Sequence, residues 1–249
     1  MNEKKQQIFF YILSILTYII FSIISAYLIY RFKTNLSISF ILISLPHIAQ
    51  LAVNLIAFKN YEIIDFKAKY IPTMAILTIL TTIAFALFDI NHTSLGPASV
   101  LDKIIMVLVV FIITPLQASN EEFSFRIIPS LYLKKYTPII TSVIFALMHM
   151  ANPESAGQNQ IFFFAYFFTT AFFFCKIGMR LNNFAPSILI HSITNIFALG
   201  FVSYKNIVVE TNTIFVLDKT PKATDSIIVS ITIFLLIYLV IYRYEKKTK

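Results

Sequence analysis

Long apolar runs, separated by short polar segments, recur along the whole of this chain. A helix that crosses a bilayer needs about 20 mostly apolar residues. Runs near that length lie at residues 7–30, 36–58, 70–88, 104–133, 137–151, 161–181, 184–203 and 226–242, although the fifth is short and the fourth carries charges. We therefore predict an all-α fold, a polytopic membrane helix bundle of about eight transmembrane helices, in one integral membrane domain over residues 1–249.

The composition agrees with a chain that lies largely in lipid. Hydrophobic residues make up 58% of the chain and charged residues 13%, whereas a soluble domain is nearer half apolar and a quarter charged. The first run is longer than the apolar core of a signal peptide and lacks a clear small-residue cleavage site, so we interpret it as a retained span. Cys175 is the only cysteine, which excludes an intrachain disulfide. We interpret its side chain as a small apolar group packed in a helix.

The formal net charge of +8 predicts an orientation rather than a nucleic-acid partner. Lysine and arginine occur in short clusters beside the apolar runs, without a basic face interleaved with aromatic residues. Cytoplasmic segments of membrane proteins hold the excess of these residues. With eight spans and the N-terminus inside, the inner segments hold 14 of the 20 and the outer segments 6. We expect a multi-pass protein of the cell membrane, in contact with lipid, with both termini cytoplasmic and no nucleic-acid partner.

Several polar side chains interrupt the later apolar runs. An ionisable group at membrane depth costs about 2.5–3.5 kcal/mol on insertion scales, so each is a candidate for a functional site. Some of them lie four residues apart, which places both members of a pair on one helix face. These pairs are Glu122 with Arg126, Phe145 with His149, and His191 with Asn195, and Glu121 precedes the first pair.

Depth along the helices predicts that these residues meet. Counted at 1.5 Å per residue from the predicted cytoplasmic helix ends, Glu121 and His149 lie roughly 18 Å inside, Asn195 roughly 16 Å and His191 roughly 10 Å. The short turn Lys134–Tyr136 makes the fourth and fifth helices antiparallel neighbours. We expect one intramembrane cavity that faces the cytoplasm.

A cluster of this kind suits amide hydrolysis. A carboxylate can take a proton from water while imidazole or amide donors stabilise the oxyanion. We assign Glu122 to an ion pair with Arg126, which leaves Glu121 as the base about 100° round the helix, although the reverse assignment stays open.

A zinc site is the alternative use of the same side chains. Glu121, His149 and His191 form a plausible zinc set, with water completing the coordination. The chain has no HExxH motif, so a metal would have to be held between helices. The sequence does not choose between zinc and a carboxylate acting without metal.

Three motifs in order carry a resemblance to a known family. The first is Glu121-Glu122-Phe123-Ser124-Phe125-Arg126, the second has Phe145 and His149, and the third runs from Ala185-Pro186-Ser187 to His191 and Asn195. The chain over roughly Leu101–Phe201 thereby resembles the CAAX-protease and bacteriocin-processing membrane peptidases, often called the Abi family. Ile127 departs from the pattern, because a glycine is common there.

The resemblance implies a fold and roles. It implies about eight helices around a cavity open to the cytoplasm, with residues 101–201 as the catalytic core. Glu121 would activate water with His149, His191 and Asn195 would hold the oxyanion or a metal, and Glu122 would be structural with Arg126. The substrate would be a membrane-associated peptide or protein, in peptide maturation, bacteriocin immunity or surface-protein display. We expect a bacterial source from the short chain and its bias to Ile, Lys, Asn and Phe; the oligomeric state is not indicated.

Other interpretations remain open. Glu121, Glu122 and Arg126 could form an ion-pair network that only fixes packing. His47, beside Pro46, is expected to be a hydrogen-bonded histidine at a kink, outside the site. A proton-coupled transporter could also use membrane-embedded glutamate and histidine, although no mirrored set of polar residues occurs in the other half of the chain. A non-catalytic membrane scaffold is the third alternative.

Overall fold

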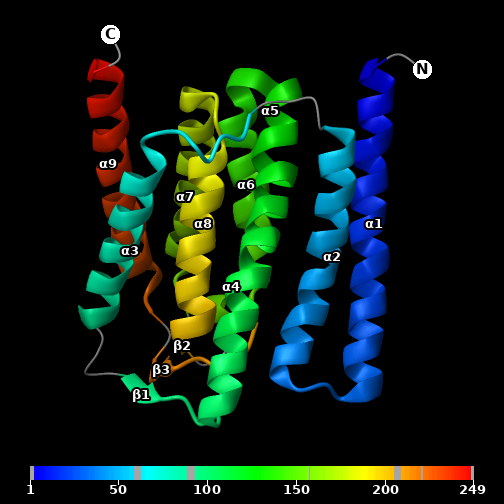
Figure 1. Ribbon diagram of the computed structural model, residues 1–249, viewed down its shortest axis with the longest axis vertical. Helices are drawn as coiled ribbons and strands as arrows, with labels where there is room; N and C mark the ends of the chain where they lie inside the picture. The colour runs from blue at the N-terminus through cyan, green and yellow to red at the C-terminus, as the bar shows by residue number, and fades with distance from the viewer. Residues whose placement is uncertain are drawn as a thin grey trace.

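The computed structural model describes residues 3–58, 63–88, 93–156, 158–204, 209–219 and 221–247, and most of them are helical (Figure 1). The α-helices are α1 (Glu3–Phe32), α2 (Leu36–Ala57), α3 (Ile71–Phe88), α4 (Val100–Glu122), α5 (Ile128–Leu133), α6 (Thr137–His149), α7 (Gln160–Leu181), α8 (Ala185–Ile196) and α9 (Ala223–Lys247). Two π-helical turns, η2 (Phe123–Ile127) and η5 (Phe197–Phe201), follow α4 and α8, and the 3₁₀ turns are η3 (Lys134–Tyr136) and η4 (Pro153–Ser155). Each predicted apolar run contains helix.

Five helical segments of the described chain are long and apolar enough to cross a membrane. They are Gln6–Phe32, Leu36–Ala57, Val100–His149, Gln160–Leu181 and Ala223–Lys246, and the shorter apolar helices are Ile71–Leu87 and Ala185–Phe201. The segment Val100–His149 is not one straight rod, because Lys134 has a φ of 48° and the chain reverses at η3. A multi-span membrane protein is therefore supported, while the number eight stays a prediction.

Local polar residues explain where several helices begin. The side-chain oxygen of Asn35 accepts a hydrogen bond from the amide of Ile38 at the start of α2. Ser99 caps α4 in the same way, and Asn159 caps α7. A side chain that accepts from a free amide in the first turn satisfies a donor that has no partner within the helix.

The two ends of the bundle differ (Figure 1). Both termini lie at one end, together with the turn at η3 and the connection between α7 and α8. The β-strands lie at the other end. The helices α1 and α2 pack together at one side, α3 and α9 at the opposite side, and α4 packs against both α2 and α8. This arrangement fits the prediction that successive spans cross the membrane in opposite directions. Which end faces the cytoplasm stays a prediction.

A small sheet corrects the expectation of a purely helical fold. Strands β1 (Thr93–Leu95), β2 (Val202–Tyr204) and β3 (Phe215–Leu217) form it in the order β1-β3-β2. Strand β3 is antiparallel to β1 and parallel to β2. Three-residue strands are too short to show the alternation of apolar and polar residues that predicts a strand, so the sequence pattern could not indicate them.

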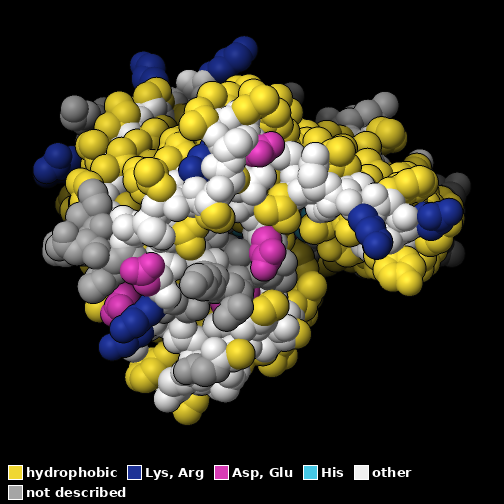
Figure 2. Space-filling model, turned by 90° about the horizontal axis from the view of Figure 1, so that it is seen from below, with side chains coloured by type: hydrophobic (Ala, Val, Ile, Leu, Met, Phe, Trp, Pro, Cys, Tyr) yellow, Lys and Arg dark blue, Asp and Glu magenta, His cyan; other side chains and the backbone are white. Residues whose placement is uncertain are grey.

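Hydrophobic side chains cover much of the outer surface. Figure 2, seen from the end that carries the sheet, shows them around the flanks, with charged side chains fewer and scattered. On α1 the exposed residues include Ile12, Leu16, Ile20 and Ile23. Such a surface is stable against lipid and costly in water.

The turn between α7 and α8 is held by one buried asparagine. The Asn183 carboxamide oxygen accepts from the amides of Asp65 and Ala185, and its nitrogen donates to the Asp65 carbonyl and the Tyr70 hydroxyl, all at 2.9–3.0 Å. The following residue, Phe184, packs against η2. This turn therefore fixes the start of α8 beside the segment that carries the two glutamates.

Candidate active site

Glu121 and Glu122 are the last two residues of α4, directly before the π-helical turn η2. Single π turns inserted into helices occur frequently at functional sites, because the extra residue redirects the side chains that follow. The next helix, α5, continues from this turn. Ile127, where the family pattern commonly has glycine, is fully buried in a hydrophobic cluster with Phe123 and Phe184.

The predicted pair of Glu122 and Arg126 is present. Arg126 Nη1 lies 3.1 Å from Glu122 Oε1, and both side chains are almost fully buried. The guanidinium also lies over the ring of Phe145, 4.4 Å from its centroid. The carboxylate and the guanidinium compensate each other's burial, and the aromatic ring adds a cation–π contact.

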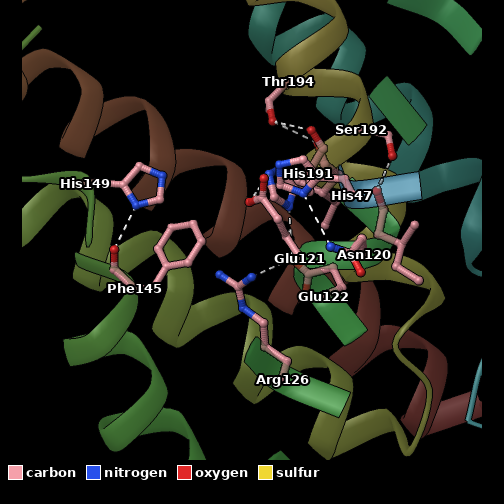
Figure 3. Close-up of polar contacts among 12 residues, drawn as sticks. His47, Asn120, Glu121, Glu122, Arg126, Phe145, His149, His191, Ser192 and Thr194 are labelled. Carbon is pink, nitrogen blue, oxygen red and sulfur yellow. Dashed lines mark hydrogen bonds and ion pairs between the residues drawn. The ribbon is translucent and has the colours of Figure 1, made fainter. Parts of the chain in front are cut away.

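His191 lies between the two carboxylates (Figure 3). Its Nδ1 is 3.0 Å from Glu122 Oε1 and its Nε2 is 3.7 Å from Glu121 Oε2. The Phe174 ring stacks on the imidazole with a centroid distance of 5.5 Å. The short contact is a hydrogen bond in which Nδ1 donates to the Glu122 carboxylate, so Nε2 is the nitrogen that faces Glu121.

Glu121 differs from Glu122 in access. The Glu121 side chain keeps 16% of its surface exposed, whereas that of Glu122 keeps none. Glu121 lies in electrostatic range of three histidines and one arginine, namely His191, His47, His149 and Arg126. A carboxylate that activates water needs an open face, and of the two only Glu121 has exposed surface.

His149 has a fixed ring orientation at the end of α6. Its Nδ1 donates to the Phe145 carbonyl at 2.8 Å. The ring is held between Phe167, at 4.1 Å between centroids, and Phe145, at 4.2 Å. With its proton on Nδ1, a neutral His149 presents Nε2 as a hydrogen-bond acceptor. Figure 3 shows this second nitrogen on the side of the ring toward Glu121.

Asn195 is the predicted site residue that the structure does not join to the others. It lies one helical turn after His191 on α8 and is half-buried. Its side chain makes no hydrogen bond within the described part of the chain. Its carboxamide is therefore free to contact a ligand, but no distance links it to Glu121.

Two further residues adjoin the site, His47 and Asn120. His47 is hydrogen-bonded, as the sequence predicted, but lies closer to the site than expected, and Asn120 was not singled out from the sequence. Asn120 Nδ2 lies 3.3 Å from His47 Nδ1, and Tyr18 Oη lies 3.4 Å from His47 Nε2. Figure 3 shows the His47 imidazole beside that of His191. The signal was a histidine deep in an apolar run, but the second run carries no motif of the resembled family.

Two cavities of the bundle lie apart from these side chains. A cavity of about 490 Å³ is lined by residues of α3, α7, α8, α9, η5 and the strands β2 and β3, and its wall includes Phe174, the ring that stacks on His191. A second cavity of about 280 Å³ is lined by residues of α1, η2, α5 and α6. Neither is lined by Glu121, His149 or His191. The cytoplasm-facing cavity around the site stays a prediction.

The proposed zinc set does not have the geometry of a metal site in this arrangement. Among the described residues, no group of three or more His, Cys, Asp or Glu side chains is placed to hold one metal ion. The Nδ1 of His149 donates to the Phe145 carbonyl and that of His191 to Glu122, so each histidine could offer a metal only its Nε2. Because no third ligand group is placed with them among the described residues, the reaction proposed for this site uses no metal, and a zinc requirement stays a prediction.

Comparison with known proteins supports the resemblance. A family model described as type II CAAX prenyl endopeptidase Rce1-like matches residues 100–197, less than half of the chain. No curated protein and no solved structure matched. The matched segment holds Glu121, Glu122, Arg126, His149 and the α8 motif, so the resemblance to CAAX-processing membrane peptidases is confirmed. It supports a membrane endopeptidase in general terms.

Proposed function

We propose that this protein is an intramembrane endopeptidase that hydrolyses a peptide bond in a membrane-associated or amphipathic peptide, with Glu121 as the base. One observation carries the proposal. Two adjacent glutamates have opposite environments, since Glu122 is closed off with Arg126 while Glu121 is partly exposed beside His191. Environments that separate two carboxylates in this way are typical of a division between a structural and a catalytic role.

The chemistry follows from the side chains in place. Glu121 takes a proton from a water molecule as that water attacks the peptide carbonyl carbon. The acceptor Nε2 of His149 can hold the same water, because its Nδ1 proton is committed to the Phe145 carbonyl. The developing oxyanion then needs donors, and the free carboxamide of Asn195 and the imidazole of His191 are the candidates. The proton held by Glu121 passes to the leaving amine.

Glu122 and Arg126 support this chemistry without reacting. Glu122 accepts from His191 Nδ1 and so sets which imidazole nitrogen faces Glu121. Arg126 pairs with the Glu122 carboxylate and holds it in place. The packing of Arg126 on Phe145 joins this pair to α6, the helix that carries His149.

The activity is tested with reconstituted protein. Purified chain in phosphatidylcholine and phosphatidylglycerol vesicles is given a library of amphipathic peptides that carry a fluorophore and a quencher. We expect cleavage that is lost in Glu121→Gln, His149→Ala and His191→Ala while all three variants stay folded, with an unchanged thermal midpoint in Glu121→Gln. If the wild-type protein cleaves no peptide of the library, the result counts against a peptidase. Cleavage that survives in Glu121→Gln overturns the choice of base.

The same variants separate the alternatives. Proton uptake into these vesicles that persists without His149 and His191 would indicate a transport mechanism that does not use these two histidines. A cellular phenotype that is unchanged in all three variants would favour a scaffold.

We also propose eight spans, with both termini and the η3 turn in the cytoplasm and the sheet outside. The common position of the termini and η3 at one end of the bundle and the excess of lysine and arginine in the inner segments support this orientation. Because Cys175 is the only cysteine and is buried, single cysteines at Lys135 and Ser94 in a Cys175→Ser background report on opposite ends. In intact cells an impermeant maleimide should label position 94 and not 135; the reverse labelling inverts the orientation.

A further inference from the structure

Three polar side chains of α2 form a stripe that faces α4. His47, Gln50 and Asn54 occur at intervals of three and four residues, which places them on one face of the helix. Gln50 Oε1 accepts from Asn120 Nδ2 at 2.8 Å, and Asn54 Nδ2 donates to Asn120 Oδ1 at 3.5 Å. All three therefore meet the carboxamide of Asn120, the residue immediately before Glu121.

The hydrogen bonds of Asn120 determine which nitrogen of His47 carries a proton. An amide nitrogen only donates, and Asn120 Nδ2 has two hydrogens. One is directed to Gln50 Oε1 and the other to His47 Nδ1, which must therefore be an unprotonated acceptor. The proton of a neutral His47 then lies on Nε2, where it faces the hydroxyl oxygen of Tyr18 at 3.4 Å.

His47 lies near the reacting groups as well as near Asn120. It lies close enough to Glu121 to act on its charge, as His191 and His149 do. Its ring also meets Tyr18 edge-on, with centroids 5.0 Å apart. Its position is thus set from both sides, by Asn120 of α4 and by Tyr18 of α1.

We propose that His47 is a positioning residue of the hydrolytic site, which holds Asn120, and through it the last turn of α4, so that Glu121 faces His191. This inference rests on the proposed peptidase function and extends it to a helix outside the matched residues 100–197. Helix α2 could pack against α4 through apolar side chains alone, so the polar contact between His47 and Asn120 needs a reason beyond packing. Buried polar groups in a membrane bundle are costly unless they are paired. Here the partner of His47 is Asn120, the residue immediately before the proposed base Glu121.

The test separates positioning from packing by the nature of the replacement. His47→Leu removes the acceptor for Asn120, whereas His47→Asn keeps a carboxamide oxygen near the position of Nδ1. We expect kcat to fall about 10- to 100-fold in His47→Leu with KM changed little, because a small displacement of a reacting group acts on the chemical step. His47→Asn should recover most of this loss. Tyr18→Phe should cause a smaller loss than His47→Leu.

Ser44→Ala is the matched control. Ser44 is buried on the same helix and donates to the Phe40 carbonyl, away from Asn120. This variant should keep wild-type kcat. If His47→Leu fails to fold, Asn120→Ala, which removes the donor and leaves the imidazole, must show the same fall in kcat. A kcat within threefold of wild type in His47→Leu, or no recovery in His47→Asn, overturns the proposal.

A measurement without substrate distinguishes failure of the His47 arrangement from failure of the proposed function. The chain has four histidines, so ring ¹⁵N resonances of labelled protein in nanodiscs can be assigned by single substitutions. We expect a neutral His47 protonated on Nε2, and we expect His47→Leu to shift the His191 resonances but not those of His149. A His47 ring protonated on Nδ1, or unshifted His191 resonances, contradicts the arrangement. If the wild-type chain cleaves no peptide while these resonances behave as expected, the function fails and the arrangement stands.

Discussion

Glu121 and Glu122 are neighbours in the chain, yet the first is partly exposed beside His191 and the second is completely buried against Arg126. The two residues occupy the last turn of α4, where the π-helical turn begins. Successive residues on a helix point about 100° apart, so one can face the site while the other faces the packed interior. This division gives the two glutamates different expected responses to substitution.

Glu121→Gln and Glu122→Gln should fail in different ways. Glu121→Gln removes the base and keeps the shape, so we expect kcat to fall by about 100-fold or more with an unchanged thermal midpoint. Glu122→Gln leaves Arg126 buried without a counter-charge, which costs about 3–5 kcal/mol. Cleavage rates and thermal unfolding in detergent, measured on both variants, test these two expectations. Equal stability in the two variants would contradict the division of roles.

Arg126→Met separates charge from packing. It removes the guanidinium and leaves the buried Glu122 carboxylate without compensation, so we expect a large loss of stability in the single variant. The double variant Glu122→Gln, Arg126→Met carries no buried charge at this position and should recover much of that stability. Thermal midpoints of the two single variants and the double variant form a mutant cycle. Additive losses would show that the two side chains are not coupled.

Phe145→Leu should impair the orientation of His149. The Phe145 ring lies against both the His149 imidazole and the Arg126 guanidinium. Leucine keeps an apolar side chain but loses the flat surface, and we expect kcat to fall severalfold with a small loss of stability. Phe168→Leu on α7, which stacks on Phe164 and Phe172, is the control and should keep kcat. Equal effects in the two variants would assign the loss to general packing.

Chelation should leave cleavage intact. The described side chains do not place three metal ligands together, so in the proposed mechanism Glu121 takes the proton of the water and His149 holds that water, without a metal. We expect cleavage to persist after dialysis against a chelator, with less than one equivalent of transition metal per chain. Activity that is lost on chelation and restored by zinc alone would reinstate the zinc set of Glu121, His149 and His191.

Asn183→Ala should destabilise the chain without touching the reacting groups. It removes the partners of the Asp65 backbone and of the Tyr70 hydroxyl, and unpaired buried groups cost about 1–3 kcal/mol each. Asn182→Gly is the matched control, because Asn182 has a φ of 47° and glycine adopts that conformation without strain. Thermal unfolding should show a lower midpoint in Asn183→Ala and an unchanged one in Asn182→Gly.

The pairs within one helix were predictable from spacing, whereas contacts between helices were not. Glu122 and Arg126 are four residues apart, and this interval alone places them together on a helix. His47 and Asn120 are 73 positions apart, and only the packing of α2 on α4 brings their atoms to 3.3 Å. Asn195 shows the limit of the same spacing rule, since it shares a helix face with His191 but is not joined to the carboxylates.

The sequence by itself determined the membrane-spanning character, the helical runs and the candidates Glu121, Glu122, Arg126, His149, His191 and Asn195, because hydropathy and helical periodicity act over neighbouring residues. Only the tertiary structure decided which glutamate is closed off, that His191 lies between the two carboxylates, and that His47 contacts Asn120, the residue before Glu121. The three-stranded sheet was decided there as well. These features depend on how distant helices and segments pack, and that packing combines many weak contacts that no local pattern records.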